Sequence, residues 1–351
     1  MSGKESASMD EMPYSMDEMP YEASILLCSR NRADILEKTL QSLRGVKVPP
    51  RWSVELLLAD NASTDRTPEV VSAFEHPDML VQGLSEPSPG KSKALNRAIS
   101  ASSGKVLLFT DDDVRFPQHW IERMSAPILQ DTADAVQGGV ELAESVNPDW
   151  MTPRHRGVLA STERIDADQP SRLVGANMAI ARKVFNEITM LDPELGVGGK
   201  YGAGEDTLLS WQLREAGLRI ESAFDVSVEH HVVPSRLSFE AFEEMAEKQG
   251  RASAYMSYHW KHRRYPLPAL YAGWAYYTAR LWWQRVVNGI CGDAGEEMPM
   301  NEFLLRRKIY RICQHLCEHG TPRRYDQRGL TKKNTQPVSE KGLASESWNA
   351  R

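Results

Sequence analysis

The sequence predicts an α/β fold, in which a mostly parallel sheet is flanked by helices and followed by a C-terminal helical appendage. Over residues 23–237, short apolar runs alternate with amphipathic segments, the pattern of βαβ units around a parallel sheet. After residue 238 the composition shifts to long helical segments. A chain of 351 residues can bury a full core in a large domain with such an appendage.

The strands and helices of the first region follow from apolar runs and from helix-end signals. Strands are expected at 25–28, 54–58, 106–109, 135–137 and 218–223, and helices at 35–43, 67–74, 92–100, 120–129 and 206–216. Asp34 and Asp65 can cap helices, while Pro68 and Pro117 suit first turns. Gly217 follows the last helix, where glycine commonly ends one. Residues 141–172 are expected to form a long loop.

Both ends of the chain are expected to be disordered tails. Residues 1–22 contain a tandem heptapeptide, 8–14 followed by 15–21, and two copies are too few to build a repeat fold. Residues 321–351 are polar and poor in core-forming side chains. The sequence therefore predicts an α/β domain at 23–237 and a helical region at 238–320 between two tails.

The charge pattern and the cysteines indicate the class of partner and the compartment of the protein. The net charge is −6 with both signs interspersed, so no nucleic-acid partner is expected. The four cysteines contain no CxxC pair, and Cys28 lies in an apolar strand pattern, which fits a reducing compartment. The N-terminus lacks a secretory signal pattern, and no apolar run approaches the roughly 20 residues of a spanning helix. We expect a cytoplasmic protein. Peripheral contact with the inner face of the membrane is a second expectation.

Residues 266–290 suggest that peripheral contact, because aromatic side chains alternate there with arginines. The segment contains Tyr271, Trp274, Tyr276, Tyr277, Arg280, Trp282, Trp283 and Arg285. Packing against a neighbouring domain is the commoner explanation of such a stripe, and we favour it. A helix lying in a bilayer interface is the second interpretation.

Three adjacent carboxylates, Asp111, Asp112 and Asp113, directly follow the apolar run 106–109. Parallel sheets bind ligands beyond the carboxyl ends of their strands, so the triplet is placed where a ligand should be. Adjacent carboxylates repel one another unless a cation offsets them, and hard oxygen ligands suit Mg²⁺ or Mn²⁺. The alternative is an Asp-rich turn with no ligand.

Four further patterns flank the triplet in sequence order. They are Ser29-Arg30-Asn31-Arg32, Asp60 to Asp65, the run Pro89-Gly90-Lys91 to Asn96, and Gly204-Glu205-Asp206. As a set, over about two thirds of the chain, these motifs resemble glycosyltransferase family 2. The resemblance implies a GT-A fold over 23–237 and an inverting transferase that uses a nucleoside-diphosphate sugar.

The resemblance also assigns a donor site. It implies that the residues contacting the donor are Ser29, Arg30, Asn31, Asp60, Lys91, Asn96, Asp111 and Asp112. Asp60 would contact the base, commonly uracil, so a UDP-sugar is expected in preference to a GDP-sugar. From the residues alone, Asp60 can equally cap a local turn, and either lysine near Gly90 can be solvated.

The cofactor expected from the resemblance is Mn²⁺ or Mg²⁺. The DxD motif maps to Asp111 and Asp113, with Asp113 as the direct ligand, and a histidine after the strand near 228 would be a further ligand. The spacing to Pro234 favours His231, although the doubled histidine leaves His230 open. Neutral imidazole suits Mn²⁺.

The acceptor side of the site is expected around two segments. Asp206 is the general base implied by the resemblance, with Glu205 as the fallback; an acid that only caps a helix is the alternative. Gly175, Ala176 and Asn177 would line the sugar and acceptor region. Gly196 to Gly204 read as a loop that could close over bound donor.

The predicted function is transfer of a hexosyl group to an acceptor hydroxyl, on a sugar or a lipid-linked acceptor. Polysaccharide or glycolipid biosynthesis, for the cell envelope or an exopolysaccharide, is the expected pathway. Two alternatives remain: a non-catalytic protein that binds nucleotide sugars, and a haloacid-dehalogenase-type phosphohydrolase whose nucleophile motif residues 107–114 also match.

Overall fold

The computed structural model describes residues 19–146, 148–168, 170, 172–290 and 298–324. Most of the N-terminal repeat and most of the predicted C-terminal tail lie outside these residues. The first domain begins slightly before the expected boundary, because Tyr21 and Glu22 already belong to the first strand. At the other end, residues 321–324 are described and contact the helical region, as through the hydrogen bond from the Arg324 amide to His259 Nδ1.

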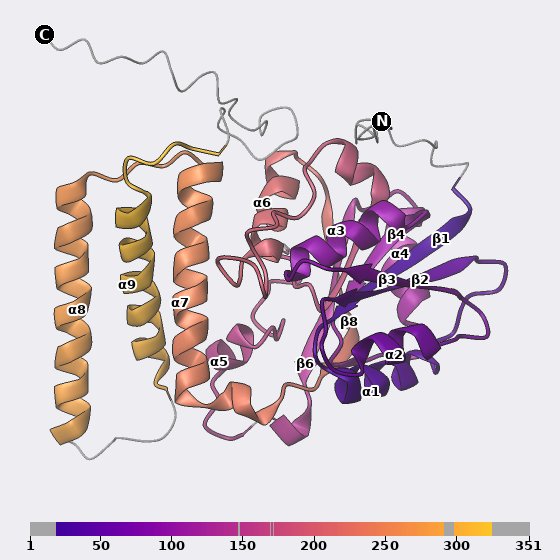
Figure 1. The fold of residues 1–351 in the computed structure, drawn as a ribbon, viewed down its shortest axis with the longest axis horizontal. Helices are drawn as coiled ribbons and strands as arrows, with labels where there is room; N and C mark the ends of the chain where they lie inside the picture. Colours follow the sequence, from indigo (N-terminus) through magenta and orange to yellow (C-terminus); the bar gives the residue numbers. More distant parts are fainter. Residues whose placement is uncertain (1–18, 147, 169, 171, 291–297, 325–351) are drawn as a thin grey trace, which may run out of the picture.

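An eight-stranded mixed sheet forms the centre of the molecule (Figure 1). Its strands are β1 (Tyr21–Ser29), β2 (Val54–Asn61), β3 (Leu80–Glu86), β4 (Gly104–Thr110), β5 (Val114–Arg115), β6 (Ala135–Leu142), β7 (Asn177–Ala181) and β8 (Ile220–His230). Their order is β3-β2-β1-β4-β7-β6-β8-β5. Four of the seven pairings are parallel, and β7 runs antiparallel to both of its neighbours.

The helices surround this sheet or form a separate layer beside it. They are α1 (Ala33–Leu43), α2 (Thr67–Ala73), α3 (Lys91–Ala101), α4 (Trp120–Leu129), α5 (Pro153–Val158), α6 (Glu205–Glu215), α7 (Phe239–Tyr255), α8 (Leu267–Ile290) and α9 (Met300–Glu318). Short 3-10 turns occupy Glu144–Val146, Arg182–Asn186 and Pro234–Leu237, and a π-helical turn at Met256–Trp260 extends α7.

The mostly parallel α/β arrangement is confirmed, and the differences from it concern elements with weak sequence signals. β3 was not predicted, because as an exposed strand it lacks a continuous apolar run. β5 is two residues long, and α5 lies inside the region predicted as loop. α9 was not recognised as a separate helix within the predicted helical region.

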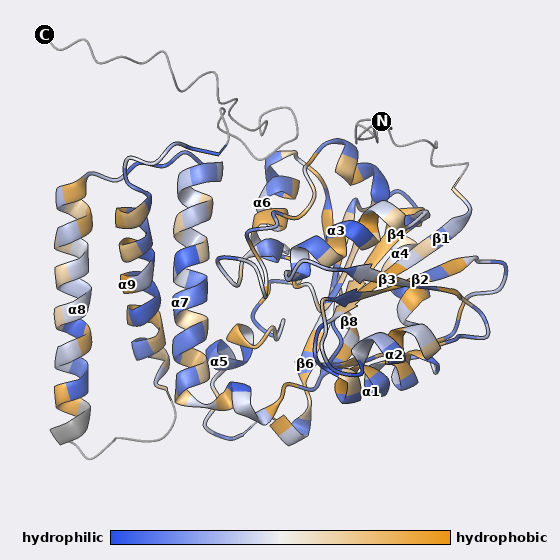
Figure 2. Cartoon of the chain, in the orientation of Figure 1, coloured by the Kyte–Doolittle hydropathy of each residue, from blue (hydrophilic) through white to orange (hydrophobic). Residues whose placement is uncertain are grey.

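The main core forms where apolar strands meet amphipathic helices. Figure 2 shows hydrophobic residues concentrated along the central strands. β2 is buried along its whole length, and the inner face of α1 presents Leu36, Leu40 and Leu43 at helical spacing. α3 packs on β1 to β3, and α4 packs across β4, β6, β7 and β8. This core fixes the strand ends that carry the polar residues described below.

The helical region forms a layer in which α9 lies between α7 and α8 (Figure 1). Ser238 caps α7, accepting a hydrogen bond of 3.2 Å from the Ala241 amide. Gly250 lets α7 and α9 approach closely, since a Cβ there would lie 2.5 Å from the Arg307 carbonyl oxygen. None of the described helices is both long and apolar enough to cross a membrane.

Two small hydrophobic clusters join this helical layer to the α/β domain. One contains Val146, Leu159 and Val232 of the first domain with Phe242 and Phe303 of the helices. The other surrounds the glycine-rich segment and is formed by Leu195, Tyr201, Leu208, Ala252, Tyr255, Met256 and Trp260. Because both clusters are buried, α7 is held as a wall beside the functional site.

Candidate active site

Three neighbouring parallel strands end together at one edge of the sheet. β1 lies between β2 and β4, with Ser29 in register with Asp60 and Leu27 in register with Thr110. The segments that follow these strands therefore converge, as expected where ligands bind in α/β sheets. The N-termini of α3 and α6 and the end of β8 complete this edge.

A cavity of about 870 Å³ opens at this edge. The sequence-predicted residues that line it are Ser29, Arg30, Lys91, Asp111, Asp112, Asp113, Gly175, Ala176, Glu205 and Asp206. Residues of α7 and α9 form the opposite wall. The fold thus brings donor, metal and base candidates from separate segments into a shared space.

Arg32 binds two members of the aspartate triplet. Its guanidinium donates to Asp112 at 2.5 Å and to Asp113 at 2.8 Å. Asp112 also accepts a hydrogen bond of 2.6 Å from the Ser29 hydroxyl. Burial raises the pKa of Asp112 to about 6, although Arg32 opposes this effect. Arg32 was part of the quoted motif but not among the predicted site residues; its position after a strand beside Asn31 gave no specific signal.

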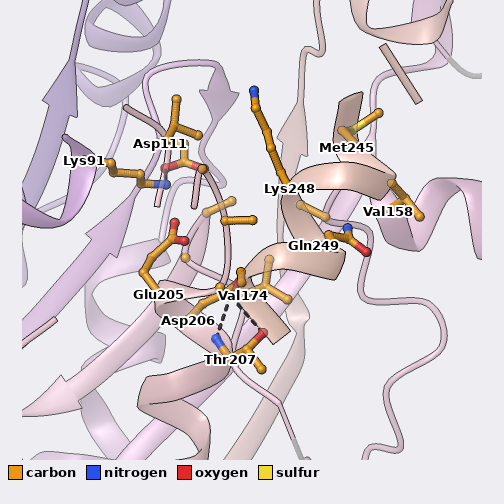
Figure 3. A pocket seen from close by; sticks show the side chains of 18 of the residues that line it. Lys91, Asp111, Val158, Val174, Glu205, Asp206, Thr207, Met245, Lys248 and Gln249 are labelled. Carbon is orange, nitrogen blue, oxygen red and sulfur yellow. Dashed lines mark hydrogen bonds and ion pairs between the residues drawn. The ribbon is translucent and has the colours of Figure 1, made fainter. Parts of the chain in front are cut away.

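Lys91 is ion-paired with the third member of the triplet, Asp111 (Figure 3). It stands at the start of α3, immediately after Gly90, whose φ of 142° favours glycine. Burial alone would lower the pKa of Lys91, but Asp111 and Glu205 outweigh it and raise the pKa. A charged ammonium is therefore fixed at the mouth of α3, close to Gly175.

The histidine beside the triplet is His230, and the expectation for His231 needs correction. His230 Nε2 lies 3.1 Å from Asp113 Oδ1, and its other ring nitrogen lies 3.1 Å from the Leu159 carbonyl oxygen. His231 Nε2 lies instead 3.3 Å from Glu229 Oε1. β8 continues through His230, so strand alternation sends the two neighbouring side chains to opposite faces.

The residues around Asp113 fit a site for a divalent cation whose remaining ligands would come from the substrate. Asp113 Oδ1 is buried and faces His230 Nε2 at 3.1 Å, so the two atoms could bind the same cation. Burial would raise the pKa of Asp113, but His230 and Arg32 hold it below its usual range. Among the described residues, no three His, Cys, Asp or Glu side chains could hold a metal by themselves. Mg²⁺-type sites with one or two carboxylates plus substrate phosphates match this donor set.

Glu205 and Asp206 begin α6 and point into the cavity from below Lys91 and Asp111 (Figure 3). Burial and the adjacent Asp206 raise the pKa of Glu205 to about 7, with Lys91 opposing them. Asp206 Oδ1 accepts a 2.6 Å hydrogen bond from the Thr207 amide. Gly204 has a φ of 97° and turns the chain into the helix, which aims both acids at the cavity.

Several predicted site residues do not line the cavity. Asn96 is held by the Leu191 backbone through hydrogen bonds of 2.7 and 3.0 Å, so its predicted donor contact is not supported. Asn177 is fully buried and binds the Gly139 and Val226 carbonyl oxygens, so it braces the sheet instead of lining the acceptor region.

Asn31 and Asp60 support the loops around the donor end. Asn31 Oδ1 accepts a 2.7 Å hydrogen bond from the Thr64 amide, which ties the loop after β1 to the loop after β2. Asp60 Oδ1 is 3.3 Å from the Ser63 amide, the local turn contact that its alternative interpretation predicted. Neither lines the cavity, whereas the neighbouring Asn61 does.

Comparison with known proteins identifies the domain that carries this site. The family model "Glycosyl transferase family 2" matches residues 24–189. Residues 24–189 therefore form a glycosyltransferase family 2 domain. The match includes the carboxyl ends of β1 and β2, Lys91 and the aspartate triplet, and it stops before Glu205 and Asp206.

Two curated relatives match parts of this chain. The Haloferax volcanii protein "Glycosyltransferase AglE" is 30% identical over 34% of this chain and 39% of its own length. The Rhizobium meliloti "Succinoglycan biosynthesis protein ExoA" is 25% identical over 56% of this chain and 59% of its own length. The matched regions therefore span between about two fifths and three fifths of these relatives.

A solved structure supports the GT-A fold over most of the chain. The mannosyltransferase PcManGT from Pyrobaculum calidifontis, in complex with GDP-Man and Mn²⁺, superposes with a TM-score of 0.54 at 20% sequence identity. The match covers 85% of this chain and 88% of the mannosyltransferase. The fold of the chain is thus GT-A.

Proposed function

We propose that this protein is an inverting, metal-dependent glycosyltransferase that moves a sugar from a nucleoside-diphosphate sugar to an acceptor hydroxyl. The observation that carries the proposal is the shared cavity, in which the aspartate triplet and His230 face Glu205 and Asp206. A family 2 domain supplies the reaction class. The cavity thus contains both residues that could bind a cation and a carboxylate that could accept a proton. Transfer of a sugar from a diphosphate to a hydroxyl needs both.

The residues divide the work as follows. Asp113 and His230 would hold Mn²⁺ or Mg²⁺, with Asp111 near the ribose; the bound cation would neutralise the departing diphosphate as a Lewis acid. Lys91 and Arg30 place positive charge beside the same end of the cavity. Asp206 accepts the proton of the acceptor hydroxyl, which attacks the sugar from the face opposite the leaving group. Attack from that face inverts the anomeric centre.

For the donor and the pathway we propose only a chemical class. A nucleoside-diphosphate sugar is supported by the family and by the GDP-Man bound to the structural neighbour. The sequence favoured UDP, so both bases need testing. The name of the succinoglycan relative supports polysaccharide or glycolipid biosynthesis. A haloacid-dehalogenase-type reaction is disfavoured because the triplet belongs to the family 2 match.

The deciding experiment is calorimetric binding of UDP and of GDP, with and without Mn²⁺, to the wild type and to Asp113→Ala. We expect one nucleotide to bind in a Mn²⁺-dependent manner and the variant to lose that dependence, because Asp113 supplies the available carboxylate oxygen. Binding of neither nucleotide by the wild type would contradict the proposal.

The two neighbouring histidines provide a matched pair for the same assay. His230→Ala should weaken Mn²⁺-dependent binding by about 10–100-fold, the usual cost of removing a metal-site partner. His231→Ala should bind as the wild type does, since His231 contacts Glu229 away from the cavity. Equal effects of both substitutions would remove His230 from the metal site.

We also propose that α8 rests on an anionic membrane surface. Its exposed aromatic side chains are Tyr271, Trp274, Tyr276, Trp282 and Trp283. Its charged residues are Arg280 and Arg285, with no acid on the helix. Among the described helices α8 packs mainly on α9, so its exposed aromatic residues and Arg280 remain open to lipid, whereas Arg285 is paired with Glu302 of α9. The charge of Arg280 favours anionic headgroups as the partner.

A further inference from the structure

Three cationic side chains of α9 line the cavity without a carboxylate partner in the described part of the chain. They are Arg307, Lys308 and Arg311. Arg307 donates to the Gln249 amide oxygen at 3.2 Å, and Arg311 donates to the Tyr265 hydroxyl at 3.2 Å. The Lys308 ammonium lies 4.9 Å from the Tyr277 ring centroid. All three charges therefore contact neutral groups only.

Three other arginines of the same bundle are paired with acids. Arg306, the immediate neighbour of Arg307, contacts both Glu302 and Glu243. Arg285 contacts Glu302 at 2.9 Å, and Arg251 lies 3.4 Å from Glu247. None of these three arginines lines the cavity. The three cations of α9 that line the cavity therefore lack the acidic partners that these arginines have.

Keeping these cations together has an electrostatic cost. Arg307 is half-buried, and burial followed by the nearby Arg311 lowers its pKa. A bound anion would offset both effects, and guanidinium groups match the geometry of phosphate oxygens. The wall is therefore prepared for an anionic ligand.

The α7 part of this wall adjoins the start of α6, where the proposed function places the acceptor. Gly204, which precedes the two acids of α6, adjoins α7: a Cβ there would be 3.2 Å from both Ala252 and Met256. The aliphatic stem of Lys248 similarly packs against Gly202. The donor end has its own cations, Arg30, Arg32 and Lys91. The cations of α9 are left for a different ligand.

Building on the proposed function, we propose that the acceptor carries a phosphate ester, held by Arg307 and Arg311 with Lys308 at the rim, while its hydroxyl faces Asp206. The phosphate belongs either to a lipid or to a soluble chain. Recognition of this charge would favour a phosphorylated acceptor over a neutral sugar of the same size.

The test measures binding of three probes to the full chain by calorimetry, with Mn²⁺ and saturating UDP or GDP present to fill the donor end. The probes are octyl phosphate, glycerol 1-phosphate and octyl glucoside. We expect octyl phosphate to bind at least about tenfold more tightly than octyl glucoside, which has the same tail and no charge. Binding of glycerol 1-phosphate as well would indicate a soluble source, and binding of octyl phosphate alone a lipid source.

Two double variants separate the wall from general charge. Arg307→Gln/Arg311→Gln should lose at least about tenfold in affinity for octyl phosphate while nucleotide binding stays within about twofold. Arg263→Gln/Arg264→Gln removes the same charge from an exposed loop outside the cavity and should bind as the wild type does. Arg307→Lys/Arg311→Lys should recover part of the lost affinity, and thermal melting checks that each variant is folded. The exposed Lys308→Gln substitution gives a second, milder probe of the same wall.

Two results would overturn the inference. Equal affinity of the wild type for octyl phosphate and octyl glucoside would show that no phosphate is recognised. A parallel loss of nucleotide binding in Arg307→Gln/Arg311→Gln would assign these cations to the donor diphosphate. If the wild type binds neither nucleotide, the proposed function fails, and the probes are then titrated without nucleotide to judge the anion site by itself.

Discussion

At the scale of single residues, neighbouring acids with similar sequence signals have different environments. Asp111 is paired with Lys91, whereas Asp112 and Asp113 share Arg32. Glu205 is raised in pKa by burial beside Asp206, so near neutral pH it is partly protonated. A pKa near the working pH also suits a general base, so Glu205 stays the fallback to Asp206, which the resemblance to the family favours.

The base assignment predicts unequal effects of two isosteric substitutions. Asp206→Asn should lower sugar transfer by about 10²–10⁴-fold, because no group would then accept the hydroxyl proton, while nucleotide binding is retained. Glu205→Gln is the matched control and should cost less than about tenfold in the same transfer assay.

The pH profile gives an independent check of the same assignment. If Glu205 were the base, the rate would rise as pH increases through about 7, where its carboxylate forms. Such a rise, together with full activity of Asp206→Asn, would contradict the role of Asp206. Loss of that rise in Glu205→Gln would identify Glu205 as the titrating group.

At the scale of elements, the helical region has two different surfaces. α7 and α9 contact each other through Phe242 and Phe303, and both residues share a buried cluster with Leu159 of the α/β domain. α8 is outermost, and Trp282 and Trp283 are 64% and 63% exposed. Packing against a neighbouring domain, the interpretation favoured from the sequence for residues 266–290, therefore does not account for the exposed aromatic residues of α8.

The exposed face of α8 predicts binding to lipid vesicles. Trp282→Ala/Trp283→Ala should weaken sedimentation with vesicles of phosphatidylcholine and phosphatidylglycerol by about tenfold or more, because two interfacial anchors are lost. The wild type should bind less to phosphatidylcholine alone, since Arg280, which has no carboxylate partner among the described residues, then loses its anionic partner.

Tyr265→Ala is a suitable aromatic control for that experiment, because Tyr265 is half-buried beside His315 and not on the exposed face of α8. Its vesicle binding should equal that of the wild type. Absence of wild-type binding to either vesicle would rule out the membrane role of α8.

At the scale of the whole molecule, Glu318 links three distant segments. Its carboxylate accepts hydrogen bonds from Tyr201 in the glycine-rich segment at 2.9 Å and from Gln314 at 2.7 Å, and it lies 3.1 Å from His259 in the π-helical turn. Burial would raise the pKa of Glu318, but these partners lower it to about 2. The last helix thereby holds the glycine-rich segment in place.

The depressed pKa predicts how stability depends on pH. A carboxylate with a lower pKa in the folded state stabilises the fold above its unfolded pKa of 4.5, and this contribution is lost as pH falls toward 2. Glu318→Gln should lower the free energy of unfolding by roughly 1.5–3 kcal/mol near pH 7, as loss of bonds to a charged group usually does. The deficit relative to wild type should shrink below pH 4.5, measured by urea unfolding.

An exposed acid supplies the control for this series. Glu187→Gln should leave unfolding unchanged at every pH, because Glu187 lies at the surface. A Glu318→Gln deficit that stayed constant from pH 7 to pH 3 would show that packing, and not ionisation, accounts for the effect.

The sequence by itself determined the class of fold and most of the chemistry of the site. Apolar runs at strand spacing predicted β1, β2, β4 and β6, because buried parallel strands need continuous apolar side chains. Motif order then predicted Lys91, the aspartate triplet and the two acids of α6, and all of them line the cavity. Local patterns carry this information since each motif follows directly from the end of an element.

Tertiary structure alone decided which side chains face one another. Strand alternation selected His230 over His231, and backbone packing took Asn96 and Asn177 away from the cavity. The exposed strand β3 was not predicted, because its position in the sheet depends on pairing with β2 and not on a local sequence pattern. The wall of α7 and α9, with Arg307 and Arg311, arises from contacts between distant segments, which no local pattern encodes.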